Sequence, residues 1–153
     1  MTESPARQET ALPPSYAGDV RPREAWAMIE REAAAQLMDV RTEVEWAFVG
    51  VPDLSPLGRQ ALFCEWQRHP SAANPDFIQE AMAALSESSY RNGAPLLFLC
   101  RSGGRSRAAA IAVTAAGYGP CFNIMDGFEG ALDAGKRRGA RGWKADGLPW
   151  IQS

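Results

Sequence analysis

The sequence predicts an α/β domain in which a mostly parallel central sheet carries helices on both faces. Short continuous apolar runs, such as residues 36–40 and 96–99, are typical of strands buried on both sides. Helical patterns over residues 22–34, 74–88 and 105–116 alternate with these runs. This alternation indicates a parallel sheet, and ligands of such sheets bind at the carboxyl ends of the strands.

The N-terminal elements follow from a change of pattern after residue 18. Residues 1–18 contain three prolines and no apolar period, so we expect a flexible tail, followed by one domain over residues 19–153. Pro22 suits the first turn of a helix. Trp26 and Ile29 are spaced to share the buried face of that helix.

The middle of the chain predicts a further strand over residues 60–66, which we place at an edge of the sheet. Cys64 lies inside this strand, and we interpret it as a packing residue. His69 stands next to a proline and is predicted to be a surface loop residue, with gating of a site as the alternative. Asn74 and Pro75 are a suitable cap and first position for the next helix.

Composition narrows the classes of function. The formal net charge of −2 gives no support for binding to nucleic acid or to a membrane surface, and the apolar run 108–116 is too short to span a bilayer. The three cysteines (Cys64, Cys100 and Cys121) form no close pair, and no export signal is evident, so we expect reduced thiols and a cytoplasmic protein. A single histidine, His69, excludes histidine-rich zinc sites.

The loop that starts at Cys100 is the predicted centre of function. It follows the strand 96–99, contains Gly103 and Gly104, and leads into the alanine-rich helix 105–116. Backbone N–H groups at a helix N-terminus favour an anion, here the thiolate of Cys100. A buried structural cysteine is the alternative, but two glycines and three arginines within seven residues favour a reactive thiol.

At this point the sequence resembles a known family. Residues 100–106 resemble the active-site loop of rhodanese-type sulfurtransferases, and residues 39–41 (Asp-Val-Arg) match the family's first motif. Residues 143–149 resemble its usual ending, so the resemblance covers about residues 19–150. Two departures stand out: Val51 replaces the usual histidine, and residues 131–142 form an insertion rich in lysine and arginine.

The resemblance implies a sulfurtransferase with a rhodanese-like fold. It would move a sulfane sulfur from thiosulfate or a similar small anionic donor to cyanide, a thiol or a protein cysteine, through a persulfide on the catalytic Cys100. A sulfur-relay protein is a further candidate partner, and no metal or organic cofactor is implied. The resemblance assigns substrate binding to the rest of the loop: Arg101, Ser102, Gly103, Gly104, Arg105 and Ser106.

Several roles stay open at the level of sequence. Arg101 and Arg105 are expected to bind the oxyanion end of a donor, whereas Ser106 either donates a hydroxyl or caps the helix. Glu43 and Glu45 are interpreted as partners in a local ion pair. The inserted segment, with Lys136, Arg137, Arg138 and Arg141, is either a solvated basic loop or a positive flap beside the site.

Two other classes of function compete with sulfur transfer. Phosphatases and arsenate reductases also place a cysteine before an arginine in a loop that opens a helix, but they usually separate the two by five residues. Here four residues lie between Cys100 and Arg105. A non-catalytic sensor or binding module is the third possibility, although such modules can lose the cysteine that this chain retains.

Overall fold

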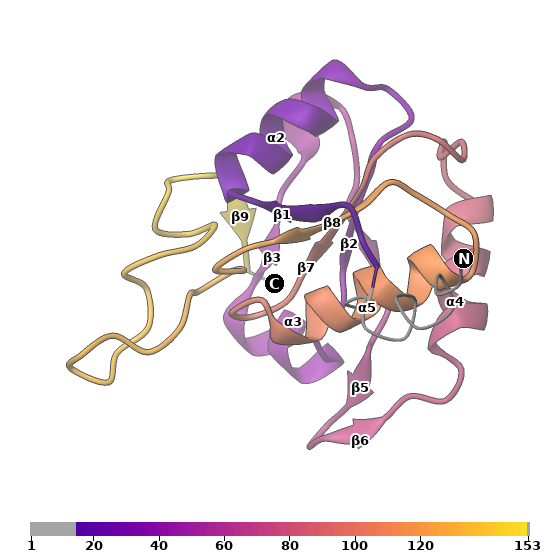
Figure 1. Ribbon diagram of the computed structural model, residues 1–153. Helices are drawn as coiled ribbons and strands as arrows, with labels where there is room; N and C mark the ends of the chain where they lie inside the picture. Colours follow the sequence, from indigo (N-terminus) through magenta and orange to yellow (C-terminus); the bar gives the residue numbers. More distant parts are fainter. Residues whose placement is uncertain (1–14, 153) are drawn as a thin grey trace, which may run out of the picture.

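A five-stranded parallel sheet forms the centre of the molecule, for which this computed structural model describes residues 15–152 (Figure 1). The strand order is β1-β8-β7-β2-β4, and every neighbouring pair is parallel. This confirms the predicted α/β class. The strands are β1 (Gly18–Val20), β2 (Gln36–Asp39), β4 (Leu62–Phe63), β7 (Leu96–Leu99) and β8 (Cys121–Ile124).

Helices cover both faces of this sheet, as Figure 1 shows. Helix α2 (Pro22–Arg31) lies on one face, and α4 (Phe77–Ser86) and α5 (Gly104–Ala115) lie on the other. The shorter α3 (Glu43–Val49) follows β2 at the carboxyl end of the sheet. Within residues 15–152, no helix is both long and apolar enough to cross a membrane.

The central strand β7 explains why the sheet needs two layers of helices. Leu96 and Phe98 pack into the apolar cluster with α4 and α5, whereas Leu97 and Leu99 pack into the cluster with α2. All four side chains are fully buried. The continuous apolar run was therefore a correct indication of a strand buried on both faces.

Two small antiparallel pairs lie outside the main sheet. Strand β3 (Val51–Pro52) pairs with β9 (Trp150–Ile151), and β5 (Gln67–Arg68) pairs with β6 (Ala72–Ala73) in a hairpin. A short 3₁₀ helix, η1 (Ser55–Leu57), follows β3. The sequence predicts a loop around His69 and no strand at the other places, because two-residue strands are too short to show an alternating pattern.

The first strand corrects the predicted start of the domain. Gly18, which the sequence places in the tail, pairs with Phe122 at the start of β1, and Tyr16 packs against the core. A three-residue strand carries too little pattern to be predicted. The remainder of the predicted tail, residues 1–14, lies outside the described residues.

The middle of the chain also differs from its prediction. The strand expected over residues 60–66 is only β4, which does lie at the edge of the sheet. Asn74 is not a helix cap, because α4 begins after Asp76. Instead the buried Asn74 amide donates to the Glu65 carbonyl and the Glu80 carboxylate, so it links the hairpin region to α4.

Candidate active site

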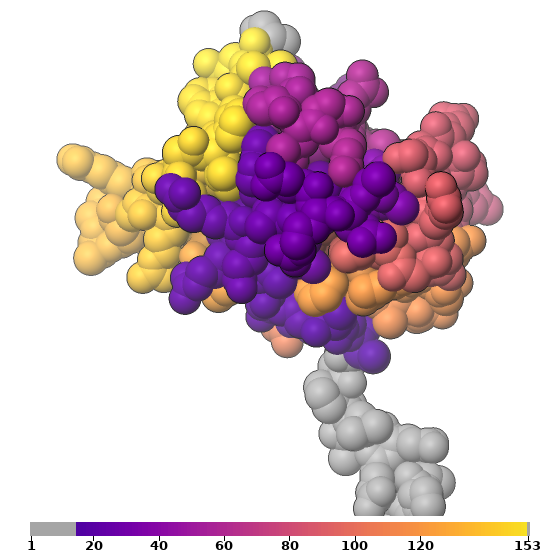
Figure 2. Space-filling model, turned by 90° about the horizontal axis from the view of Figure 1, so that it is seen from above, coloured from indigo at the N-terminus to yellow at the C-terminus, as the bar shows by residue number. Residues whose placement is uncertain are grey.

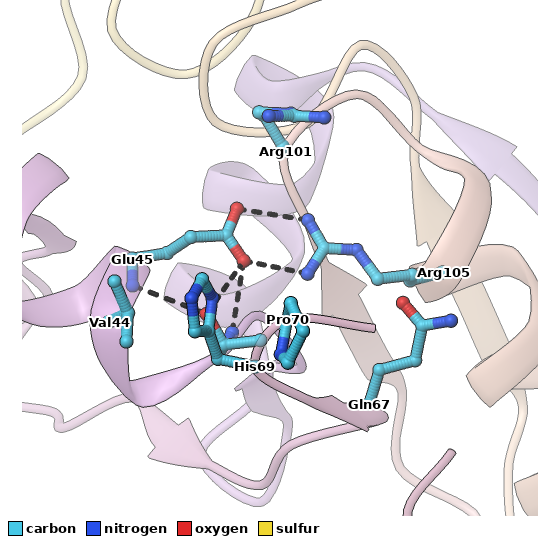
Figure 3. A pocket seen from close by; sticks show the side chains of 8 residues that line it. Val44, Glu45, Gln67, His69, Pro70, Arg101 and Arg105 are labelled. Carbon is cyan, nitrogen blue, oxygen red and sulfur yellow. Dashed lines mark hydrogen bonds and ion pairs between the residues drawn. The ribbon is translucent and has the colours of Figure 1, made fainter. Parts of the chain in front are cut away.

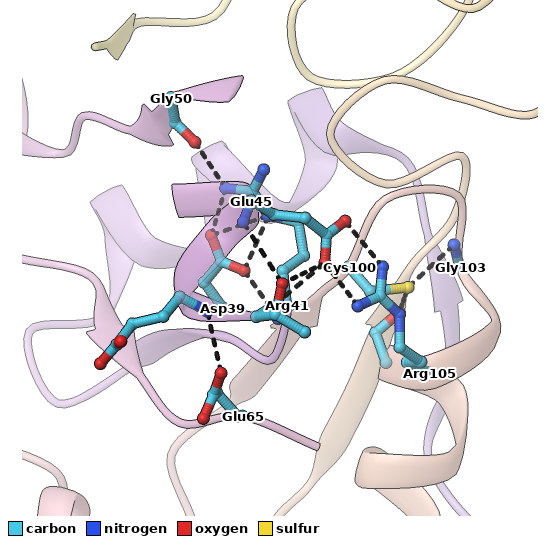
Figure 4. A network of polar contacts seen from close by, with 11 residues as sticks. Asp39, Arg41, Glu45, Gly50, Glu65, Cys100, Gly103 and Arg105 are labelled. Atoms are coloured by element: carbon cyan, nitrogen blue, oxygen red, sulfur yellow. Dashed lines mark hydrogen bonds and ion pairs between the residues drawn. The ribbon is translucent and has the colours of Figure 1, made fainter. Parts of the chain in front are cut away.

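The cysteine loop connects the central strand to a helix N-terminus. Cys100 directly follows β7, and Gly103, with φ of 118°, is the N-cap of α5. The Gly103 N–H donates to the Cys100 sulfur over 3.1 Å (Figure 4). A positive φ of this size favours glycine. The sulfur therefore lies where the amides and the dipole of α5 favour negative charge.

The turn after β8 holds this loop from behind. The Phe128 N–H donates to the Cys100 carbonyl over 2.8 Å, and two further amides of the same turn donate to the Arg101 carbonyl. Gly127 approaches the loop so closely that a Cβ would lie 2.4 Å from the Cys100 oxygen. Only glycine fits there, so the turn at residues 127–130 fixes the position of the cysteine.

The Asp39-Val40-Arg41 motif supports the site and does not form it. Arg41 pairs with Asp39 over 2.7 Å, and both side chains are buried. The same guanidinium donates to the Gly50 carbonyl over 2.8 Å and lies 4.2 Å from the centre of the Phe128 ring. This pair therefore joins the end of β2 to the end of α3 (Figure 4). Through Phe128 it also contacts the turn behind the loop.

Ser106 faces the cysteine from inside α5. Its hydroxyl oxygen is fully buried, 3.2 Å from the Cys100 sulfur and 2.5 Å from Asn123 Oδ1. The alternative that Ser106 caps the helix is wrong, because Gly103 occupies the cap. Its hydroxyl contacts the nucleophile and β8 at a depth where it does not reach the surface. Sequence reasoning did not single out Asn123.

Arg105 is bound to a carboxylate from another element. Its two terminal nitrogens donate to the two oxygens of Glu45 over 2.7 and 3.0 Å (Figure 3). The predicted local ion pair is therefore wrong for Glu45, whose partner lies 60 positions along the chain. Thr42 donates to the same carboxylate through its N–H and hydroxyl, in a capping box that starts α3.

The Glu45 carboxylate is held in its charged form. Burial raises the pKa of Glu45, but hydrogen bonds from Arg105 and Thr42 and the charge of Arg105 outweigh it and lower the pKa to about 2. Arg105 is therefore compensated by a nearby negative charge. Glu45 uses two of the five N–H donors of Arg105. Arg105 therefore offers an anionic donor fewer free N–H groups and less uncompensated charge than an unpaired arginine would.

A cleft of about 330 Å³ opens over the cysteine loop (Figure 3). Arg101 is exposed in it and makes no ion pair with any described residue. His69, exposed as predicted, reaches the cleft from the β5–β6 hairpin. The cleft is lined by loop, α3 and hairpin residues: Thr42, Val44, Glu45, Gln67, His69, Pro70, Arg101 and Arg105.

The remaining predicted residues divide into two groups. Ser102 and Gly104 are exposed on the loop, at positions open to a ligand. The inserted residues 131–142 extend from one side of the molecule, and none of them lines the cleft (Figures 1 and 2). Arg138 uses one nitrogen to donate to the Gly130 carbonyl over 2.9 Å, which anchors the insertion to the turn behind the cysteine loop.

Comparisons with known proteins agree with this architecture. Residues 18–153 match the family model described as STR4 middle domain. The crystal structure of Rv0390 from M. tuberculosis superimposes with a TM-score of 0.82 at 50% identity, covering 91% of this chain and 100% of that one. An uncharacterized protein of Rickettsia rickettsii is 39% identical over 126 residues, which are 82% of this chain and 90% of the relative.

A more distant relative carries a descriptive name. The rice protein THYLAKOID RHODANESE-LIKE, chloroplastic, is 31% identical over 137 residues, which are 87% of this chain but only 25% of the rice protein. The match to the family model spans nearly the whole described chain and includes both edge strands of the sheet, β1 and β4. The chain therefore belongs to the STR4 middle domain family, and its relatives include proteins named rhodanese-like.

Proposed function

We propose that this protein is a sulfurtransferase that carries a sulfane sulfur as a persulfide on Cys100. The observation that supports this most is the Gly103 N–H donated to the Cys100 sulfur at the N-terminus of α5. A cysteine at such a position is suited to act as a nucleophile in its thiolate form. The rhodanese-like names of its distant relatives point in the same direction.

In the first half-reaction, an anionic donor such as thiosulfate enters the cleft beside Arg101. This guanidinium has no carboxylate partner among residues 15–152, so it is the cation best placed to bind the oxyanion end of the donor. The Cys100 thiolate attacks the outer sulfur. The S–S bond of the donor breaks, sulfite leaves with the bonding electron pair, and a persulfide remains on Cys100.

In the second half-reaction, a thiophilic acceptor removes the added sulfur. Cyanide or a thiolate attacks the outer sulfur of the persulfide, the bond to the Cys100 sulfur breaks, and the electron pair returns to Cys100 as a thiolate. The two half-reactions predict ping-pong kinetics. No metal or organic cofactor takes part in either step. Exposed Ser102 and the Gly103–Gly104 backbone are proposed to contact the donor, with Arg105 contributing charge beside the sulfur.

Mass spectrometry of the intact protein tests this proposal directly. Incubation with thiosulfate is expected to add the mass of one sulfur atom, located on the peptide that contains Cys100, and cyanide is expected to remove it. Cys100→Ser is expected to gain no sulfur. A wild-type protein that stays unmodified, or one that gains sulfur on Cys64 or Cys121, contradicts the proposal.

An aryl phosphate serves as the control for the competing class of enzyme. A phosphoryl group needs donors for all its oxygens while the nucleophile attacks phosphorus in line. The loop from Cys100 to Arg105 is one residue shorter than in the usual phosphatase pattern, and Arg105 is already bound to Glu45. We expect no hydrolysis of the aryl phosphate that depends on Cys100. Cys100-dependent hydrolysis without sulfur transfer would overturn the assignment.

A further inference from the structure

A row of hydrogen-bonded side chains leads from the Cys100 sulfur to the surface. Ser106 Oγ lies 3.2 Å from the sulfur and 2.5 Å from Asn123 Oδ1. On its other side, the Asn123 amide donates from Nδ2 to Asp19 Oδ1 over 3.0 Å. Tyr16 donates its hydroxyl to the same carboxylate oxygen over 3.0 Å. Cys100, Ser106 and Asn123 are buried, whereas Asp19 is exposed on β1.

The directions of these hydrogen bonds are set from the surface inwards. The carboxylate of Asp19 only accepts hydrogen bonds, so the amide of Asn123 must turn its NH₂ group toward it. The amide oxygen of Asn123 then faces Ser106. An oxygen that only accepts and a hydroxyl oxygen 2.5 Å away form a favourable contact only when the hydroxyl proton lies between them.

Ser106 has a single proton, and two groups compete for it. When the proton lies toward Asn123, the hydroxyl turns a lone pair toward the Cys100 sulfur. A lone pair suits a thiol, which can donate its S–H, and opposes a thiolate, which needs donors. If Ser106 turned its proton to a thiolate, its oxygen would face Asn123 Oδ1 with no proton between them.

The amide of Asn123 could relieve that contact only by flipping. A flipped amide would donate to Ser106 but would place its oxygen against the Asp19 carboxylate. We propose that Asp19 is a positioning residue that acts through Asn123 and Ser106 to hold the Cys100 sulfur in its protonated, less reactive form. Asp19 and the Gly103 amide therefore act on the same sulfur in opposite directions.

Among residues 15–152, no other charged group near this row of hydrogen bonds orients the amide of Asn123 as Asp19 does. Arg105 of α5 lies near the Cys100 sulfur, but it is paired with Glu45 of α3. Arg41, at the end of β2, is paired with Asp39 and donates to the Gly50 carbonyl. On the outer side, Arg107 of α5 stacks over the Tyr16 ring at 5.7 Å. Arg101 is exposed on the loop itself. Among these, only Asp19 is hydrogen-bonded to the amide of Asn123.

This inference deepens the proposed function, on which its catalytic meaning rests. A Cys100 that carries a persulfide has a bridging sulfur with neither a proton nor a full charge, so the lone pair of Ser106 opposes it less than it opposes a thiolate. Transfer of the outer sulfur to an acceptor thiolate breaks the S–S bond and returns the electron pair to Cys100. Asp19 is therefore expected to slow this release and to keep the sulfur loaded.

The test measures alkylation of Cys100 by iodoacetamide at a fixed neutral pH, with the modified peptide identified by mass spectrometry. Asp19→Asn keeps the shape of the side chain and lets Asn123 adopt either orientation. Asp19→Ala removes the acceptor altogether. Both variants are expected to react faster than wild type, by roughly threefold to tenfold for one hydrogen bond gained by the thiolate. This readout needs no sulfur donor, so it stays informative if the proposed function fails.

Two controls separate the row of hydrogen bonds from a simple loss of charge. The backbone nitrogen of Asp126 would lie 3.8 Å from a Cβ placed on Gly103. Asp126→Asn removes a carboxylate from the turn after β8 and changes none of the hydrogen bonds of the row, so its rate should stay near wild type. In a Ser106→Ala background, Asp19→Asn is expected to have no effect on the alkylation rate. The hydroxyl proton whose direction Asp19 sets through Asn123 is absent in that background. Unchanged rates in both Asp19 variants, equal gains in Asp126→Asn, or a full gain without Ser106 would each overturn the proposal.

Discussion

Two cysteines directly follow strands of the main sheet, but a hydrogen-bond donor contacts the sulfur of one and acceptors contact the sulfur of the other. Cys100 directly follows β7 and Cys64 directly follows β4, with exposed fractions of 1% and 4%. Each contacts the first turn of a helix. The sulfur of Cys100 accepts the Gly103 N–H over 3.1 Å, whereas the thiol of Cys64 donates to the Phe77 carbonyl over 3.7 Å.

The surroundings of Cys64 keep it a thiol. Burial, followed by the charges of Glu80 and Glu65, raises the pKa of Cys64 to about 12. The Glu80 carboxylate lies 4.0 Å from its sulfur. Burial and position after a strand therefore do not distinguish a reactive cysteine. The groups at the helix end determine whether the cysteine is reactive. Amide N–H groups favour a thiolate, and carbonyl or carboxylate oxygens favour a thiol.

The largest expected effect comes from removing each sulfur in turn. Cys100→Ser is expected to abolish transfer of sulfur from thiosulfate to cyanide, because a serine oxygen is not a thiolate and cannot carry a persulfide. Cys64→Ser is expected to retain most of the activity, since its thiol points at acceptors. Steady-state kinetics of the two variants measure the difference. An inactive Cys64→Ser with an active Cys100→Ser would reverse the comparison.

A second difference between the two cysteines is the uncompensated cation beside Cys100. Arg101→Ala is expected to raise the KM for thiosulfate roughly fivefold to 150-fold, which corresponds to about 1–3 kcal/mol for a lost charged hydrogen bond. Arg107→Ala is the matched control, because Arg107 is also exposed but stacks on Tyr16. An unchanged KM in Arg101→Ala would remove this residue from donor binding.

Local sequence was sufficient for the strand, loop and helix around Cys100, because their pattern depends on neighbouring residues. It was not sufficient for the contacts that tune the sulfur. Glu45 reaches Arg105 across 60 positions, and Asn123 reaches Asp19 across 104 positions. No spacing rule connects residues so far apart, and the strand that carries Asp19 is only three residues long.

The role of a glycine was easier to predict from the sequence than the partner of a charged residue. Gly103 was expected to give the cysteine loop a backbone conformation that other residues rarely adopt, and it has a φ of 118°. The charged residues were harder to interpret, since a guanidinium is equally suited to a donor and to a carboxylate. Arg105 has the carboxylate and Arg101 does not, and nothing in their shared loop sequence distinguishes them.

The raised pKa of Cys64 predicts a dependence of stability on alkaline pH. The folded protein holds this proton up to about pH 12, whereas the ordinary value for the thiol is 9.0. Below pH 9.0 both states are protonated and the contribution to stability is complete. As the pH rises above 9.0, the unfolded state loses its proton first, so the free energy of unfolding falls.

Cys64→Ser has no titrating group at this position, so its stability should fall less over the same range. Urea unfolding of the wild type and the variant, at one pH below 9.0 and one between 9.0 and 12, measures the two differences. Other groups that titrate there are common to both proteins and cancel. An equal loss in both proteins would show that the thiol of Cys64 is not protected by folding.

The smallest expected effect concerns whether charges outside the loop change the rate at which Cys100 reacts with thiosulfate. Lys136 and Arg137 are exposed on the inserted segment, which does not line the cleft. Exposed charges farther apart than about 8–10 Å are largely screened at physiological salt. Lys136→Gln with Arg137→Gln is therefore expected to change kcat/KM for thiosulfate by less than about twofold, within the weak influence of a screened charge.

Arg138 is kept in this variant, because its hydrogen bond to the Gly130 carbonyl anchors the segment to the turn behind the loop. Stopped-flow measurement of persulfide formation over a range of salt concentrations is the informative experiment. If the segment acts as a positive flap, the wild-type rate at low salt should exceed that of the variant severalfold, and the two should converge as salt rises. If the rates stay equal throughout, the cation that distinguishes Cys100 from Cys64 lies within the loop, at Arg101.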